Sequence, residues 1–416
     1  MRVVLVTFGT EGDTRPLLEI CHELNNAGHQ VTLLAERSTL PTNCRPGLTL
    51  IPMVGDIKID SAALVRSGKD IKRMAKVIAY IATRNAAQWM HDLTMHASGA
   101  DAVLFSGIAS YVALSVAEHK GIPAIGLGLF PISPTVEFSS PFVPPFPMPG
   151  WCNKLSHQII NGIHWRMFRG PTNLARARVL ELGPKRHMWR GYPILYGVSR
   201  HLVPTPRDWP TEWRVCGPWL HTASDWTPPS GLRDFLADGP TPLYIGFGSM
   251  VGFDRDRMMN TIVDAIGARR VVFYPGWSGI DTSSLPSNFF AVNDTPHSWL
   301  FPRVSAVMHH GGAGTTHAAA LAGTPSIVVP FIWDQAFWAT RLASLGVAPA
   351  YVPAKKIDAP QLREMIKYVE LPQVKRRAWL LGAAMATEDG TSNAVREIER
   401  IVRDANASKS SRRFRV

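Results

Sequence analysis

The fold is constrained most strongly by a repeated order of elements. A strand, a glycine-rich turn and a helix follow one another in both halves of the chain. Residues 3–7 are a β-branched apolar run, residues 8–13 contain two glycines, and helical spacing follows from Pro16 until Gly28. Residues 242–266 repeat the same order. Because alternating strands and helices build parallel sheets covered by helices, the sequence predicts an α/β chain of two Rossmann-like parallel-sheet domains.

The length of the chain also favours two domains. Its 416 residues exceed the roughly 250–300 residues beyond which a single core stops growing. The stretch from 219 to 242 is rich in Pro, Gly, Ser, Thr and Trp and lacks sustained periodicity, so we place a linker there. The predicted divisions are a first domain at 1–220, the linker at 221–241, a second domain at 242–385, a C-terminal helix at 386–405 with the option of packing back on the first domain, and a basic tail at 406–416.

The net charge of +12 admits nucleic acid, an anionic membrane surface or a phosphate-bearing ligand as partners. No helix-turn-helix, zinc or aromatic-platform signature accompanies the charge, so we expect no nucleic-acid partner. Two interpretations of the basic tail stay open, a solvated disordered segment and a weak contact with anionic lipid. The uncharged run at 102–117 is interrupted by Ser and Gly and falls short of the roughly 20 apolar residues that cross a bilayer. The N-terminus enters a strand without a cleavage site, and together these features predict a cytoplasmic location. The four cysteines are scattered without metal-ligand spacing and are interpreted as reduced packing residues: Cys21, Cys44, Cys152 and Cys216.

Residues 307–317 combine two histidines with a cluster of small residues between an apolar strand and an Ala-rich helix. Small residues let backbone N–H groups approach a ligand, and the positive end of the helix dipole then faces an anion. His309 can donate a further hydrogen bond, and Thr315 or Thr316 can cap the helix. No Lys follows the glycines and the Gly-x-Gly-x-x-Gly spacing is absent, so the segment predicts a phosphate site that is neither a Walker A loop nor a dinucleotide fingerprint.

Two further segments carry candidate site residues. Asp334 and Gln335 follow an apolar strand, at the strand end where open α/β sheets bind ligands, and together they offer acceptors and donors to vicinal hydroxyls. Residues 131–149 hold seven prolines and form a loop rich in aromatic residues. Such a loop either lines an apolar pocket or packs on its own domain, and the pocket interpretation gives an acceptor-binding set: Phe138, Phe142 and Phe146.

Several ordered motifs resemble one known family. They are residues 9–16, 195–199, 206–210, 246–250, the double-histidine glycine cluster and residues 333–338. Taken together they resemble the nucleotide-sugar glycosyltransferases of the GT-B fold, in the branch that holds sterol glucosyltransferases and the glycosyltransferases of vancomycin-type antibiotics. The resemblance implies two Rossmann-like domains that face each other across a cleft. The first would bind a hydrophobic small-molecule acceptor and the second a UDP-sugar or dTDP-sugar, with no metal and no other cofactor.

The resemblance also implies roles for individual residues. Asp13 would be the general base of an inverting transfer, and Asp334 and Gln335 would hold the hydroxyls of the donor sugar, with glucose favoured. Trp277 and the backbone near Val292 would contact the nucleoside. The residues implied around the diphosphate are Thr10, Gly12, Ser249, His309, Gly312, Gly314 and Thr315.

Other interpretations remain beside this one. Asp13 can cap the helix that follows it, and Asp334 is a minority candidate for the base. The pair Asp254 and Asp256 has the Asp-x-Asp form of a metal site. Acidic residues in the first turn of a helix also interact favourably with the helix dipole, which explains the pair without a metal. For the whole chain, the alternatives are a nucleotide-sugar epimerase of the same fold and an inactive lipid-binding module.

Overall fold

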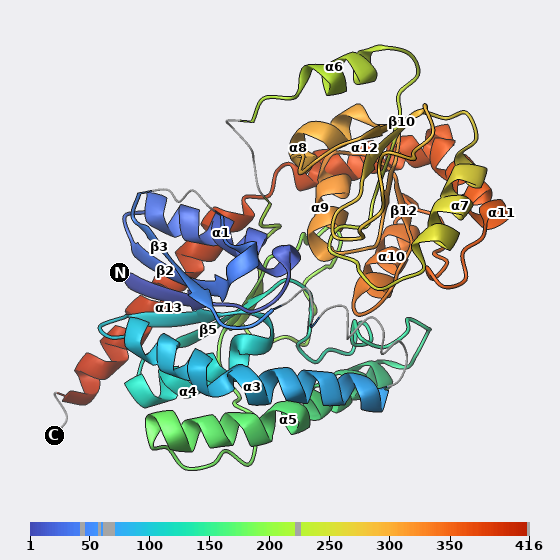
Figure 1. Ribbon diagram of the computed structural model, residues 1–416. Coiled ribbons are helices and arrows are strands. Elements are labelled where there is room, and N and C mark those ends of the chain that lie inside the picture. Colours follow the sequence, from blue (N-terminus) through green and yellow to red (C-terminus); the bar gives the residue numbers. More distant parts are fainter. Residues whose placement is uncertain (42–45, 57–59, 61–70, 221–225, 414–416) are drawn as a thin grey trace.

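The computed structural model describes residues 1–41, 46–56, 60, 71–220 and 226–413 and contains two parallel sheets, each with its own helices (Figure 1). The first sheet has seven strands in the order β3-β2-β1-β4-β5-β6-β7, and all its pairs are parallel. Its strands are β1 (Arg2–Val6), β2 (Gln30–Glu36), β3 (Leu48–Met53), β4 (Ala102–Phe105), β5 (Ala124–Gly128), β6 (Ile194–Tyr196) and β7 (Trp213–Val215). Four of the five β1 residues are buried, as expected for a strand covered on both faces.

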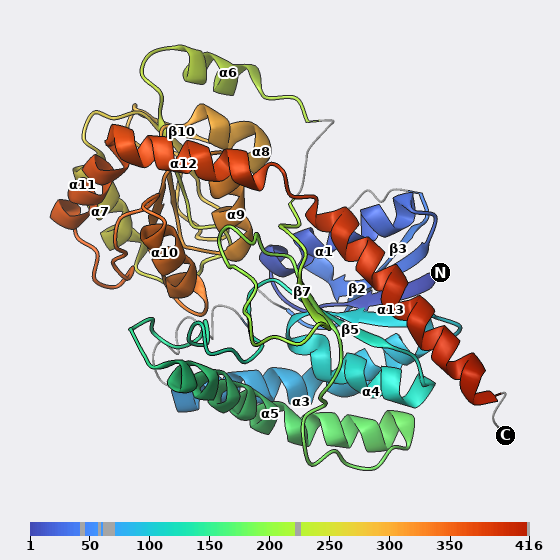
Figure 2. The same cartoon turned by 180° about the vertical axis from the view of Figure 1, so that it is seen from behind.

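Helices cover both faces of the first sheet. One apolar cluster joins α1 and α13 to one face, and a second joins α3 and α4 to the other. The helices are α1 (Glu11–Asn26), α3 (Ile71–His96), α4 (Ser110–Lys120), α5 (Gly150–Leu180) and α13 (Gly390–Arg413), with 3-10 turns at η1 (Arg37–Thr39) and η2 (Gly107–Ala109). The long helix α5 packs against α3 and lies at the outer edge of the molecule in both views (Figures 1 and 2).

The second sheet has five parallel strands in the order β10-β9-β8-β11-β12. Its strands are β8 (Leu243–Gly246), β9 (Val271–Tyr274), β10 (Phe289–Ala291), β11 (Val307–His309) and β12 (Ser326–Val328). Its helices are α7 (Arg255–Ile266), α8 (His297–Leu300), η3 (Phe301–Arg303), α9 (Ala313–Leu321), α10 (Gln335–Ser344), α11 (Ala359–Glu370) and α12 (Pro372–Met385). The predicted fold class, two Rossmann-like parallel-sheet domains, is confirmed.

The last helix, α13, returns to the first sheet (Figure 2). Its buried residues Ala394, Val395 and Ile398 belong to the same apolar cluster as Leu17 of α1. At the start of α13 the Trp219 indole N–H donates to the Gly390 carbonyl at 3.1 Å. The chain therefore crosses between the two sheets twice, and its C-terminal end completes the core of the first.

The structure adds detail to the predicted boundaries. Within 221–241, residues 226–241 include α6 (Ser230–Ala237), whose Leu232 is buried among residues of the second sheet, whereas 221–225 lie outside the described residues. The backbone of α13 continues through the predicted tail as far as Arg413, while residues 414–416 lie outside the described part, as does Cys44. No helix among the described residues has the length and apolar character needed to cross a bilayer.

Candidate active site

Asp13 lies in the first turn of α1, the helix that follows the carboxyl end of β1, a strand paired on both sides within the first sheet. The Thr10 backbone N–H donates to its Oδ2 atom at 2.7 Å, and the Thr10 hydroxyl donates to the same atom at 3.2 Å. Asp13 therefore closes the capping box of α1 with one oxygen. Its Oδ1 atom has no hydrogen-bond partner among the described residues. Burial raises the pKa of this carboxyl, and the bonds from Thr10 lower it in part.

Asp334 occupies the N-cap position of α10, beyond the end of β12 in the second sheet. The Trp338 indole N–H donates to its Oδ2 atom at 2.7 Å. Burial raises the pKa of Asp334 to about 6, and the negative charge of Asp13 contributes to that rise although the Trp338 bond opposes it. Two carboxyl groups from different sheets thus lie close enough for their charges to interact.

Gln335 is buried and holds the loop before α10 together. Its Oε1 atom accepts from the backbone N–H groups of Phe331 and Ile332, at 2.7 and 3.0 Å, and its Nε2 atom faces the Met250 sulfur at 3.4 Å. The side-chain oxygen of Gln335 is fully used, whereas among the described residues its amide N–H₂ group faces only the Met250 sulfur, which is a weak acceptor. The N–H₂ group is therefore the part of this side chain that can bind a ligand. The neighbouring Trp333 has a φ of 63°, a left-handed conformation that costs a non-glycine residue about 1 kcal/mol or more.

The two histidines of the glycine cluster lie at the end of β11 and are both buried. His309 Nδ1 accepts the Gly311 backbone N–H at 3.1 Å, so the ring proton belongs on Nε2. That Nε2 atom is buried without a partner among the described residues. Burial lowers the pKa of His309 and that of His310, the latter to about 4. His309 thus offers a neutral N–H donor rather than a positive charge.

His310 fills the space between two glycine turns. A Cβ atom on Gly312 would lie 2.4 Å from its Nε2 atom, and one on Gly248 would lie 3.1 Å from its Cε1 atom. Gly312 is the N-cap of α9, where no side chain caps the helix. The backbone N–H groups at the start of α9 are therefore free for an anion.

The remaining predicted donor residues fall into two groups. Gly12 is exposed, whereas Thr10, Ser249, Gly314 and Thr315 are half-buried near the starts of α1 and α9 or after β8.

The two residues predicted to contact the nucleoside, Trp277 and Val292, make contacts within the protein. Trp277 donates its backbone N–H to Gly248 at 2.9 Å, and its ring packs against the apolar cluster of α3 and α4 in the first domain. Val292 is buried and donates its backbone N–H to Phe273 at 2.8 Å.

The three predicted acceptor residues have different surroundings. Phe142 contacts the rings of Phe130, His164 and Trp333 edge-on, with centroids 5.3 to 5.9 Å apart. By contrast, Phe138 packs on Phe337 of α10, and Phe146 is 57% exposed.

Four residues that the sequence did not predict as site residues complete this apolar cluster: Tyr111, His164, Phe168 and Trp333. Trp333 also packs with Tyr111 and Phe168 of the first domain, so it spans the two domains. His164 projects from α5, and burial lowers its pKa to about 4. We call the set of Tyr111, Phe142, His164, Phe168 and Trp333 the aromatic cluster.

Polar contacts also join the two domains. The two terminal nitrogens of the Arg15 guanidinium, Nη1 and Nη2, donate to Oδ1 and Oδ2 of Asp294, at 3.0 and 2.7 Å. His317 of α9 accepts the Ser199 backbone N–H at 3.1 Å on Nε2 and donates from Nδ1 to Ala313 at 2.7 Å. These pairs are far apart in the sequence, and no local motif signals them.

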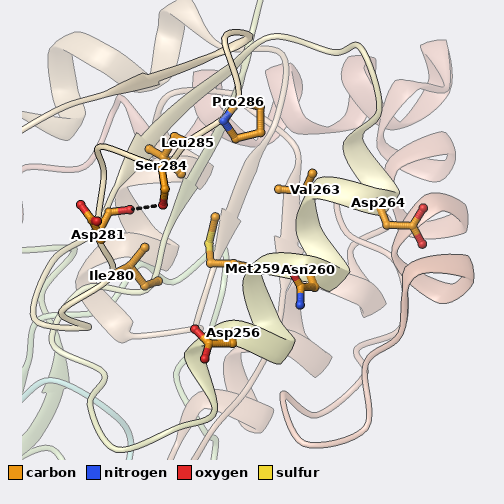
Figure 3. A pocket seen from close by; sticks show the side chains of 10 residues that line it. All are labelled: Asp256, Met259, Asn260, Val263, Asp264, Ile280, Asp281, Ser284, Leu285 and Pro286. Atoms are coloured by element: carbon orange, nitrogen blue, oxygen red, sulfur yellow. Dashed lines mark hydrogen bonds between the residues drawn. The ribbon is translucent and has the colours of Figure 1, made fainter.

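The surface hollow in Figure 3 contains none of the residues predicted to bind the donor or acceptor or to act in catalysis. It lies between α7 and residues 280–286, and its three acids, Asp256, Asp264 and Asp281, make it unsuited to a diphosphate. The nearby Asp254 caps α7 by accepting from the Arg257 backbone N–H at 3.0 Å. Within the described ranges, no group of three or more His, Cys, Asp or Glu side chains is arranged to hold a metal ion.

Comparison with known proteins gives relatives over nearly the whole chain. Residues 257–406 match the family model of the erythromycin biosynthesis protein CIII-like C-terminal domain. Sterol 3-beta-glucosyltransferases UGT80A2 and UGT80B1 of Arabidopsis thaliana are 32% and 31% identical over 95% of the chain. The chain spans 65% and 67% of the length of these plant proteins, and 30% of the Aspergillus fumigatus sterol 3-beta-glucosyltransferase, which is 31% identical.

Solved structures agree on the fold. The glycotransferase of kitacinnamycin aligns with a TM-score of 0.69 at 21% identity, covering 96% of this chain and 98% of that one. The glycosyltransferase VinC, solved with dTDP, aligns with a TM-score of 0.64 at 19% identity and covers 97% of this chain and 100% of its own. Both neighbours are glycosyltransferases, and at these identities they support the GT-B fold.

Proposed function

The chain belongs to the family of the sterol 3-beta-glucosyltransferases, and on that premise we propose that it is an inverting glycosyltransferase. It moves a hexose, with glucose favoured, from a UDP-sugar or dTDP-sugar to a hydroxyl of a hydrophobic small molecule. The observations that carry this proposal are two groups left without a hydrogen-bond partner among the described residues: one carboxylate oxygen of Asp13 in the first domain, and the ring N–H of His309 in the second. One accepts a proton, and the other stabilises a leaving group.

In the proposed reaction, Asp13 Oδ1 takes the proton of the acceptor hydroxyl as the oxygen attacks the anomeric carbon. Its raised pKa makes it a stronger base than an exposed aspartate. Attack opposite to the leaving diphosphate inverts the anomeric centre in one displacement. The two hydrogen bonds from Thr10 to Oδ2 hold the carboxyl group in place while Oδ1 accepts the proton.

The charge that develops on the leaving diphosphate needs donors rather than a base. His309 Nε2–H and the free backbone N–H groups at Gly314 and Thr315 supply them, together with the positive end of α9. These dipoles are fixed before the reaction and require no metal. Ser249, in the turn after β8, and Gly12 complete the proposed diphosphate contacts.

The donor sugar is proposed to bind at Asp334 and Gln335. The Asp334 carboxylate accepts from hydroxyls through the oxygen that Trp338 does not use, and the Gln335 amide donates through Nε2. A site that pairs buried polar groups with hydroxyls loses those bonds to a deoxy sugar, which favours a fully hydroxylated hexose.

The acceptor is proposed to bind against the aromatic cluster, with Phe142 as its main contact from the proline-rich loop. Its rings suit a sterol or another lipid-like natural product. Phe138 and Phe146 are proposed as outer contacts. The cluster includes Trp333, the neighbour of Asp334, and so brings the acceptor to the sugar-binding side of the second domain.

The experiment that tests this function offers the purified protein UDP-glucose and a dTDP-deoxyhexose in competition. Sterol, polyketide, glycopeptide and glycolipid acceptors are supplied in turn, and products are identified by mass. We expect a hexosylated hydrophobic product, mainly from UDP-glucose, and none with Asp13→Asn. A preference for the deoxy donor would contradict the proposed sugar site. An interconverted nucleotide sugar without any conjugate would favour an epimerase, and no reaction with any pair would favour a binding module.

A further inference from the structure

The outer face of helix α5 carries large apolar side chains that nothing in the described structure covers. Trp151, Leu155 and Ile159 follow one another at four-residue spacing and are 68%, 42% and 52% exposed. A surface helix normally turns such residues toward the core and exposes polar ones. This half of α5 does the reverse.

The apolar surface continues onto the proline-rich loop. Phe146 is 57% and Val136 41% exposed, and the Val136 carbonyl accepts from the Asn153 side chain at 3.0 Å, which holds the loop beside the helix. We call these five residues the apolar ridge: Val136, Phe146, Trp151, Leu155 and Ile159. A group of this size on one side of a soluble protein is typical of an interaction site.

Positive charge follows the apolar ridge along α5, whereas Lys154 beside the ridge is paired with Asp208 at 3.3 Å. Residues 150–190 contain eight Lys and Arg residues and a single acid, Glu181. Arg166 and Arg169 are exposed and have no ion-pair partner among the described residues. At about 100° per residue, both fall in the same sector of roughly 80° as the helical part of the ridge. An apolar stripe that continues into free arginines on one face matches the boundary between lipid tails and anionic headgroups.

We propose that this face of α5 docks on an anionic lipid bilayer. The apolar ridge enters the headgroup boundary, and Arg166 and Arg169 contact lipid phosphates. The proposal favours a bilayer over a protein partner because the ridge lies on the outermost helix of its side, continuous with a strongly basic segment (Figures 1 and 2). It concerns α5, and it is distinct from the basic tail.

The inner face of the same helix explains what such docking would achieve. His164 and Phe168 of the aromatic cluster project from α5 on the side opposite to the ridge. One helix diameter, about 10 Å, therefore separates the proposed acceptor site from the bilayer surface. This consequence rests on the proposed function: a lipid-like acceptor would pass from the membrane to the aromatic cluster over a short path. Docking itself does not depend on activity.

The test is flotation of the full chain with vesicles of phosphatidylcholine alone and of phosphatidylcholine mixed with phosphatidylglycerol. We expect binding to the mixed vesicles, weakened by salt. Arg166→Gln with Arg169→Gln should weaken it on the order of 25-fold, since each cation near an anionic surface contributes about fivefold. Trp151→Ala with Ile159→Ser should weaken it tenfold or more, because an interfacial Trp and a β-branched anchor are lost.

Trp379→Ala is the matched control, because Trp379 is 65% exposed beside Lys375, Arg376 and Arg377 but lies on α12 of the other domain. This control should bind like wild type, and circular dichroism should show that all variants are folded. Failure of wild type to float, unchanged flotation of the α5 variants, or equal loss in the control would overturn the proposal. A dimer in solution that Trp151→Ala dissociates would assign the ridge to a second copy of the chain instead.

An activity measurement separates this proposal from the proposed function. With UDP-glucose, the α5 variants should glucosylate cholesterol in detergent micelles as fast as wild type, but cholesterol in mixed vesicles at least tenfold more slowly. If wild type glucosylates cholesterol in neither form, the proposed sterol acceptor fails while the flotation results still decide the docking surface. Equal rates for all variants on vesicles would show that docking plays no part in acceptor supply.

Discussion

Replacing Asp334 by Asn should change how the stability of the protein depends on pH. The pKa of this carboxyl is about 6 in the folded chain against an ordinary value of 3.8, with burial as the main cause. A carboxyl with a raised pKa stabilises the fold fully below about pH 4, and this contribution is lost as the pH rises through about 6. At 1.36 kcal/mol per pKa unit the loss amounts to about 3 kcal/mol at most, and partial exposure of Asp334 reduces it.

Asn cannot ionise, and its side-chain oxygen can still accept from Trp338. The free energy of unfolding of Asp334→Asn relative to wild type should therefore increase by about 1–3 kcal/mol between pH 4 and pH 7.5. Urea unfolding at a series of pH values measures this difference. Hydrogen exchange of the backbone amides of residues 326–344 reports whether the pH-dependent loss of stability occurs in the second domain. A difference that is constant with pH would refute the argument.

Asp13→Asn provides a second check on the same argument. Because the Asp13 charge contributes to the raised pKa of Asp334, removing it should move the transition in the wild-type stability profile to lower pH. An unchanged transition would mean that the two carboxyl groups do not interact.

Four further predictions concern the proposed site and the contact between the domains. Asp13→Asn should lower turnover about 100-fold or more with donor affinity nearly intact, since the carboxylate acts on the acceptor proton; equal loss of donor affinity in calorimetry would contradict this role. His309→Ala should weaken nucleoside diphosphate binding by about 1.5–3 kcal/mol in titration calorimetry, and unchanged binding would remove it from the site. Turnover should survive excess EDTA because N–H donors stabilise the leaving group, whereas loss restored by added magnesium would require a metal. Arg15→Gln should lower the free energy of unfolding by no more than about 1 kcal/mol despite the two-bond contact with Asp294, because the pair is exposed; a much larger loss in denaturant titration would show otherwise.

The strand, turn and helix pattern could be predicted because local residue types determine it. The apolar run at 3–7 corresponds to β1 (Arg2–Val6), and the helical spacing from Pro16 to Gly28 corresponds to α1, which begins earlier, at Glu11. The long helix α5 was not anticipated, because its exposed apolar stripe obscures the usual amphipathic pattern. Short β6 and β7 depend on pairing with distant strands, so their own sequences indicate them weakly.

Side-chain geometry could not be predicted from motifs. The sequence indicated that Asp13 and the glycine cluster follow strands, but not that Thr10 occupies one Asp13 oxygen. It paired Gln335 with Asp334 as a sugar ligand, whereas the fold uses the Gln335 oxygen to hold a loop. Trp333 was part of a motif, yet its place in the aromatic cluster depends on the approach of two domains. Such contacts join residues that are remote in sequence.

The return of α13 to the first sheet has a consequence for biosynthesis. Residues up to 216 leave the ribosome before α13 does, so the core that they form lacks Ala394, Val395 and Ile398 until that helix has been made. At typical elongation rates of about 5–20 residues per second, the delay lasts about ten to forty seconds. During this time the apolar surface of α1 that α13 later covers has no native partner. The first sheet is therefore made before the second but completed after it, and its exposed apolar surface is prone to aggregation in the meantime.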